Sequence, residues 1–160
     1  MDCTAFRSLP ADTAARDDDE GAAWRDHLSG CRGCEDFVLD RRVREAGLDP
    51  AAFPCIHLAH AAAHTCDEHD DPMACPHASV VWSPRFREWG LPIRDGDAAS
   101  AYAYVVIHHC PWCGTALAPS LRAAWHEELA RRGFANPLAS WDQLPDEFRG
   151  DAWWRPAESD

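Results

Sequence analysis

In the first third of the chain, apolar residues recur among polar ones with the spacing of helices. The acidic run at residues 17–20 suits a helix N-terminus, because the helix dipole favours negative charge there, and predicts a helix that continues to Leu28. A second helix is predicted from near Cys31 to Gly47, where glycine is a common helix terminator. The segment 48–54 contains Asp and Pro and is expected to be a linker.

Further along the chain, helical and strand patterns are mixed. The Ala- and His-rich residues 56–64 predict a helix by propensity, and residues 79–82 predict a short strand. β-Branched and aromatic residues at 101–109 predict a clear second strand. Apolar residues four positions apart predict an amphipathic helix over 120–133, which is followed by an aromatic-rich tail at 136–160.

Together these elements predict an α+β chain. Residues 1–47 are expected to form a helical module, and 48–54 a linker. Residues 55–135 are expected to form a small zinc-ribbon-like domain with a short antiparallel sheet and a C-terminal helix, with a turn at 94–97. Residues 136–160 are expected to pack as an irregular aromatic arm.

Composition indicates a modest core. Hydrophobic residues make up 46% of the 160, but Ala supplies much of this share, while Trp is abundant with 8 residues. Chains that are short of Leu, Ile and Val have limited core volume, and small cores often depend on metal or disulfide staples.

The charge balance and the N-terminus narrow the class of protein. Lys and Arg number 15 against 27 Asp and Glu, which gives a net charge of −12. This charge argues against direct nucleic-acid binding and against anionic membranes. The chain shows neither a signal sequence nor an apolar stretch near the roughly 18 residues of a membrane span. We therefore expect a cytoplasmic protein, in which CxxC pairs indicate metal or redox sites rather than disulfides.

A first metal-ligand pattern lies between the two N-terminal helices. In His27-x3-Cys31-x2-Cys34, a helix–turn–helix corner brings one imidazole and two thiolates together. Tetrahedral zinc needs a fourth ligand, and Cys3 is the only cysteine upstream. A helix between Cys3 and His27 that folds back would deliver it.

Around these ligands the chain resembles the zinc-containing anti-sigma factor family. The resemblance covers residues 1–45 and rests on the His-x3-Cys-x2-Cys motif, the Leu after His27 and an upstream ligand. It implies one zinc bound by Cys3, His27, Cys31 and Cys34, and a sigma factor as protein partner. In some members of that family, oxidative loss of zinc releases the sigma factor.

A second metal-ligand pattern is built around Cys110-Pro111-Trp112-Cys113-Gly114. A CPxCG turn after a strand is typical of a zinc knuckle, since Pro stiffens the turn and Gly permits a backbone conformation that a Cβ would hinder. The knuckle needs partners, and the candidates leave several sets of four open. The full set is Cys55, Cys66, His69, Cys75, Cys110 and Cys113. Cys66-x2-His69 with Cys110-x2-Cys113 forms one zinc-ribbon-like quartet. In other sets Cys75 could replace His69, and Cys55 could enter from the start of the helix that follows it.

From residue 55 to 154 the chain resembles a family of small, uncharacterised bacterial proteins marked by a CPWCG knuckle. The resemblance implies a small zinc-ribbon α+β domain and no established activity. The matching residues are Cys66-x2-His69, Asp71-Pro72, Cys75-Pro76, Arg94-Asp95-Gly96, Cys110-Pro111-Trp112-Cys113-Gly114-Thr115, Leu117, Pro119-Ser120-Leu121-Arg122, Trp125 and Trp153-Trp154.

A histidine stripe offers a third place for a metal. His57, His60 and His64 fall at i, i+3 and i+7, which places them on one helical face. Three imidazoles could hold zinc, copper or nickel, but a solvated polar face explains the stripe more simply.

The sequence favours a zinc-binding regulatory or interaction protein over an enzyme. Several thiolates favour closed, structural zinc, and two zinc ions are expected, one in each module. A thiol-based redox or metal sensor is the first alternative. A metal-dependent enzyme, which needs an open coordination position, is the second.

Overall fold

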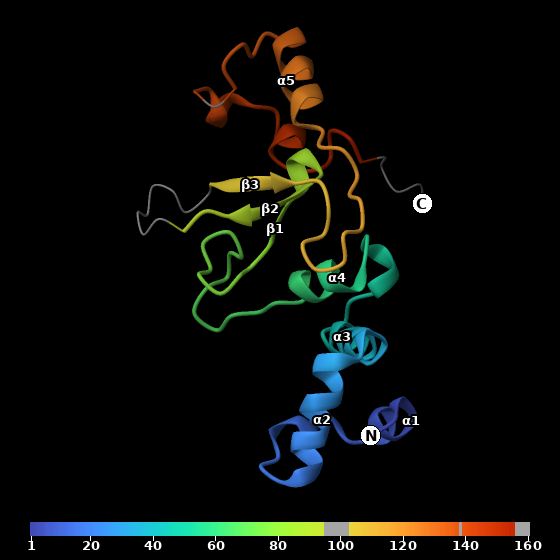
Figure 1. The fold of residues 1–160 in the computed structure, drawn as a ribbon. Helices are drawn as coiled ribbons and strands as arrows, with labels where there is room; N and C mark the ends of the chain where they lie inside the picture. Colours follow the sequence, from blue (N-terminus) through green and yellow to red (C-terminus); the bar gives the residue numbers. More distant parts are fainter. Residues whose placement is uncertain (95–102, 138, 156–160) are drawn as a thin grey trace. The chain divides into compact units, whose positions relative to one another are not determined.

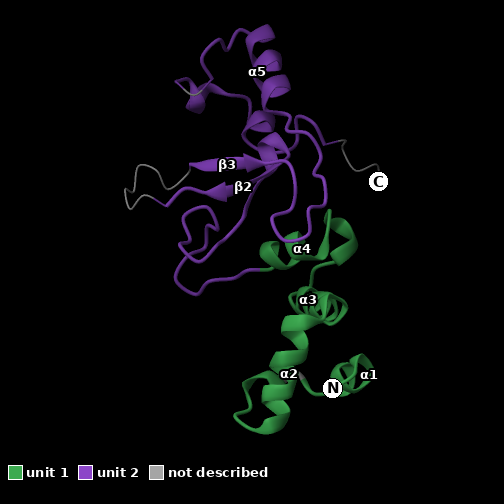
Figure 2. Ribbon diagram, viewed as in Figure 1, with its two compact units in different colours: residues 1–63 green, residues 64–160 purple. Residues whose placement is uncertain are grey.

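Helices and a small sheet make up the described part of the chain, so the predicted α+β class is confirmed. The computed structural model describes residues 1–94, 103–137 and 139–155 (Figure 1). Most of the turn predicted at 94–97 lies outside these ranges. The chain divides into two compact units, residues 1–63 and 64–160, which are coloured separately in Figure 2.

The regular elements described in unit 1 are α-helices and 3₁₀ turns. The helices predicted around Trp24 and Val38 are present as α2 and α3. Residues 48–54, expected as a linker, belong to this unit and include the 3₁₀ turn η2. Its elements are α1 (Cys3–Ser8), η1 (Ala11–Ala15), α2 (Asp19–Gly30), α3 (Arg32–Glu45), η2 (Pro50–Ala52) and α4 (Ile56–Ala62).

Capping interactions fix the start of α2 and the end of α3. Asp18 accepts a hydrogen bond from the Gly21 amide at 2.9 Å, which satisfies one of the unpaired donors at the start of α2. After α3, Gly47 adopts a φ of 78° and the Leu48 amide donates to the Val43 carbonyl at 3.1 Å. This is a Schellman motif, in which glycine avoids the strain that a Cβ meets at positive φ.

The core of unit 1 around α1 and α2 is small. It consists of Phe6, Trp24, Cys34 and Val38, each no more than 4% exposed. The Phe6 and Trp24 rings stack with their centroids 5.0 Å apart. Cys34 is both a core residue and a predicted metal ligand, so the candidate metal site adjoins this core.

Unit 2 contains a three-stranded antiparallel sheet in the order β1-β2-β3 (Figure 1). Its strands are β1 (Val81–Ser83), β2 (Glu88–Pro92) and β3 (Tyr104–Ile107). Strand β1 overlaps the strand predicted at 79–82, and β3 lies within the one predicted at 101–109. The sequence did not indicate β2, whose Glu, Gly and Pro are poor strand formers.

The predicted C-terminal helix is α5 (Arg122–Arg131), and it forms the main core of unit 2. The core residues are Phe86, Trp125, Leu129, Leu144 and Phe148, and the first of these belongs to the 3₁₀ turn η3 (Pro84–Phe86). Two further 3₁₀ turns, η5 (Trp141–Gln143) and η6 (Asp146–Arg149), lie in the tail. The tail expected as an aromatic arm therefore contributes two buried core side chains, Leu144 and Phe148.

A buried carboxylate joins the sheet to the start of α5. Glu88 is 2% exposed and accepts hydrogen bonds from the Tyr104 hydroxyl, at 2.7 Å, and from Ser120. It also forms an ion pair with Arg122. Burial alone would raise the pKa of the Glu88 carboxyl, but these three donors outweigh it and hold the pKa below its usual range.

Gly90 makes this arrangement sterically possible. It pairs with Val106 in the sheet, and a Cβ built on it would lie 2.1 Å from Cδ2 of the Tyr104 ring. Only the absence of that atom lets Tyr104 lie against the backbone of β2 and reach Glu88.

No helix within the described ranges has the length and apolar character needed to cross a bilayer.

Candidate metal centres

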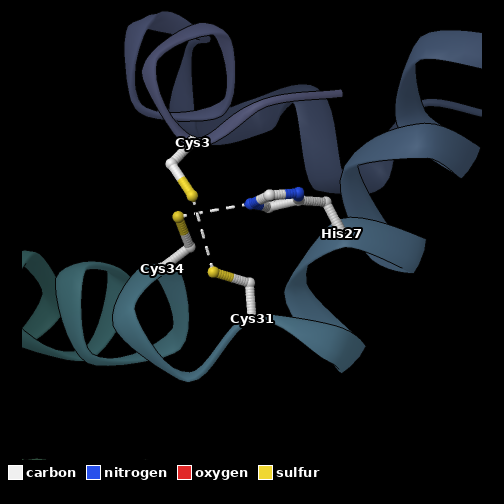
Figure 3. A group of neighbouring side chains, drawn as sticks. All are labelled: Cys3, His27, Cys31 and Cys34. Carbon is white, nitrogen blue, oxygen red and sulfur yellow. Dashed lines mark hydrogen bonds between the residues drawn. The ribbon is translucent and has the colours of Figure 1, made fainter.

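Four predicted ligands converge in unit 1 (Figure 3). The sulfur atoms of Cys3, Cys31 and Cys34 and a ring nitrogen of His27 all lie within 4.8 Å of one another. The Cys3 and Cys31 Sγ atoms are 3.6 Å apart, and His27 Nε2 is 3.3 Å from Cys34 Sγ. Figure 3 shows the four side chains pointing toward a common centre.

Local structure explains how the four side chains meet. Cys3 is the first residue of α1, whose start is fixed by Asp2, which accepts a hydrogen bond from the Ala5 amide at 2.8 Å. His27 lies in the last turn of α2, and Cys31 is the hinge residue between α2 and α3. Cys34 lies in the first turn of α3 and is fully buried. Three helices thus contribute to one cluster.

The distance of 3.6 Å between the Cys3 and Cys31 sulfurs is close to the ligand spacing of a tetrahedral metal site. Zinc–sulfur bonds of about 2.3 Å and zinc–nitrogen bonds of about 2.0–2.1 Å place neighbouring ligand atoms about 3.6–3.8 Å apart. A disulfide would require about 2.05 Å between sulfurs, and all eight cysteines are free thiols. An ion bound by all four side chains would have no open position, an arrangement that is typical of structural zinc.

Because the sulfur atoms are close together, the pKa values of the Cys3 and Cys31 thiols shift in opposite directions. Hydrogen bonds with the Cys31 and Cys34 sulfurs raise the pKa of the Cys3 thiol to about 11. The Cys34 amide, followed by the Cys3 and Cys34 thiols, donates toward Cys31 and lowers the pKa of that thiol. A cation at the centre would favour the thiolate form of all three cysteines.

A second cluster lies in unit 2, in the loop before β1. The ligand atoms of Cys66, His69 and Cys75 lie within 4.8 Å of one another, with 3.3 Å between Cys66 Sγ and His69 Nδ1. The hydrogen bond with His69 lowers the pKa of the Cys66 thiol to about 7. In the described residues this group does not include Cys110 or Cys113, so the predicted quartet with the knuckle is not assembled.

The knuckle itself has the predicted geometry. Gly114 has a φ of 72°, and its amide donates to the Cys110 carbonyl at 2.9 Å. The Cys110 amide in turn donates to the Thr115 carbonyl at 2.9 Å, which closes the turn. The Cys110 and Cys113 sulfurs lie within 4.8 Å of each other, as a two-thiolate half-site requires. Cys55 lies in unit 1, where it precedes α4, and its place in a ligand set stays a prediction.

The structure separates the three histidines of the predicted stripe. His57 is buried and faces Asp36 of α3, with 3.9 Å between Nε2 and Oδ1. Because α4 ends at Ala62, His64 lies outside the helix, and its Nε2 is 3.6 Å from Cys75 Sγ. The proximity of His64 to Cys75 was not predicted from the sequence. The signal was present in the spacing His64-x-Cys66-x2-His69, but the helical periodicity of the preceding residues obscured it.

Comparison with known proteins assigns the larger part of the chain to a family. No curated protein and no solved structure matches it. Residues 52–156 match the model of a family described as a domain of unknown function, DUF6980. Since the match covers more than half of the 160 residues, the chain belongs to the DUF6980 family.

Proposed function

We propose that this chain is a zinc-binding regulatory protein whose N-terminal site is structural and whose helices α2 and α3 contribute to binding a protein partner. The observation that carries the proposal is the closed set of Cys3, His27, Cys31 and Cys34. These ligands come from α1, α2 and α3, so one ion would hold together helices that share a four-residue core. A metal site without an open coordination position favours a structural role for the ion over a catalytic one.

The proposed partner is a sigma factor. What supports it is the resemblance of residues 1–45 to zinc-containing anti-sigma factors, together with the convergence of the four ligands that this resemblance implies. The net charge of −12 further favours a protein partner over nucleic acid.

A pull-down against a panel of sigma factors tests the partner. The wild-type protein is expected to enrich at least one of them, and the Cys31→Ser/Cys34→Ser variant is expected to lose that enrichment because α2 and α3 lose their shared ligand site. The matched control is Cys110→Ser/Cys113→Ser, which makes the same change in the CxxC pair of unit 2 and should retain binding. Equal recovery by the wild type and the Cys31→Ser/Cys34→Ser variant would contradict the proposal.

Redox control of the same site is the second candidate function, and one observation favours it. Cys3 is exposed, and its sulfur lies 3.6 Å from that of Cys31. Peroxide, a two-electron oxidant, would convert these two thiolates into a disulfide while it is itself reduced to water. The bound metal would lose two ligands.

Mild peroxide is therefore expected to release one zinc per chain, with a Cys3–Cys31 disulfide detected by mass spectrometry. A thiol reductant should restore zinc binding, and Cys3→Ser should abolish the disulfide. Retention of zinc at millimolar peroxide would rule out this second function and leave the structural role of the site intact.

A further inference from the structure

The loop that precedes the sheet of unit 2 is ordered without regular structure. Residues 64–80 contain no helix or strand, yet Cys75, Ala78 and Val80 are each no more than 7% exposed. Loops of this length without secondary structure are uncommon in compact domains unless they have a functional role. Burial of side chains in such a loop calls for something that fixes its conformation.

The ligand atoms of Cys66, His69 and Cys75 lie within 4.8 Å of one another, and His64 approaches this group at Cys75. His64 Nε2 lies 3.6 Å from Cys75 Sγ, and His69 Nδ1 lies 3.3 Å from Cys66 Sγ. Both distances are close to the edge of about 3.6 Å expected between sulfur and nitrogen ligands of tetrahedral zinc. The same four side chains help to line a cavity of about 270 Å³.

We propose that His64, Cys66, His69 and Cys75 form a self-contained Cys2His2 zinc site, separate from the CPWCG knuckle. Two thiolates and two imidazoles are donors that suit zinc better than magnesium or calcium. With His64 as the fourth ligand the site is closed, so its role is to fix the loop. The inference goes beyond the proposed function, because it concerns unit 2 and no step of it depends on a partner.

The backbone around Cys75 is already held in place for this role. The Cys75 amide donates to the Asp71 carbonyl at 3.0 Å, and the Met73 amide donates to the Asp71 side chain at 2.9 Å. The Arg94 guanidinium donates to the carbonyls of Met73, at 2.7 Å, and Cys75, at 2.6 Å. Such outer contacts orient metal ligands and reduce the entropy lost when the ion binds.

The site also explains the separate placement of the knuckle. The sequence alone allowed Cys66 and His69 to join Cys110 and Cys113 in one quartet. In the structure Cys66 and His69 are grouped with Cys75, which leaves the knuckle pair for a different ligand set.

Alkylation of the zinc-loaded full-length protein, resolved cysteine by cysteine by mass spectrometry, tests this assignment. In His64→Ala, Cys66 and Cys75 are expected to become reactive at chelator concentrations at least about 100-fold lower than in the wild type. The matched control is His77→Ala, which removes an exposed histidine two residues after Cys75 and should change nothing. His64→Cys, which restores a ligand, should recover the protection.

Two results would overturn the proposal. One is unchanged protection of Cys66 and Cys75 in His64→Ala, which would show that a water or another group occupies the fourth position. The other is loss of their protection in Cys110→Ser/Cys113→Ser while the amides of α5 still resist hydrogen exchange, which would assign them to a site shared with the knuckle. Protection of Cys3, Cys31 and Cys34 is measured in the same experiment, so failure of the N-terminal site is seen separately.

Discussion

The Cys31→Ser/Cys34→Ser protein is expected to lose one zinc equivalent and, with it, the helical order of residues 1–45. Structural zinc contributes about 10–16 kcal/mol of apparent binding free energy in small zinc-dependent domains. This is comparable to the whole folding free energy of an ordinary domain, about 5–15 kcal/mol. The buried core that would remain around the altered Cys34 is Phe6, Trp24 and Val38, with partly buried hydrophobic residues such as Leu28 and Phe37 packed against it.

Metal analysis together with amide hydrogen exchange measures this effect. Amides in α2 and α3 should exchange rapidly in the variant, and a strong chelator should produce the same change in the wild type. Amides in α5 provide the internal control in the variant, because α5 belongs to the other unit. Slow exchange in α2 and α3 of a variant that has lost the metal equivalent would show that zinc does not stabilise the helices.

The second large effect is expected at Trp125, the largest fully buried side chain. Trp125→Ala should lower the free energy of unfolding of unit 2 by about 3–5 kcal/mol, the usual cost of removing a buried aromatic ring. Its ring meets Phe86 edge to face, with 5.3 Å between centroids, and its Nε1 donates to the Phe148 carbonyl at 3.0 Å. The substitution therefore leaves a cavity and an unpaired buried carbonyl.

Denaturant unfolding followed by far-ultraviolet circular dichroism measures the loss. Trp112→Ala is the matched control, because Trp112 is 47% exposed and its truncation removes far less buried surface. Trp112→Ala should cost clearly less than Trp125→Ala. Equal costs for the two variants would place the stabilising core of unit 2 elsewhere.

Local signals made the N-terminal module predictable. An acidic run before α2 and a glycine after α3 indicated where this helical pair begins and ends, and the four N-terminal ligands form one cluster in the structure. In this module the ligands are close in sequence or belong to adjacent helices, so spacing alone carries most of the information.

The second half was less predictable because its geometry depends on contacts distant in the sequence. Strand β2 forms through its pairing with β1 and β3, despite poor intrinsic propensity. His64 was assigned to a helical face because periodicity says nothing of where a helix stops. Leu144 and Phe148 enter the core through 3₁₀ turns, which have no apolar period to detect.

The close fit of Gly90 against Tyr104 has a consequence for the evolution of this domain. Any side chain at position 90 would collide with the ring that reaches Glu88, so neither position can change freely while the other stays as it is. A lineage that replaces Gly90 must first exchange Tyr104 for a smaller residue, and Glu88 then loses a donor. The contact therefore predicts that residues 88, 90 and 104 change together among related sequences.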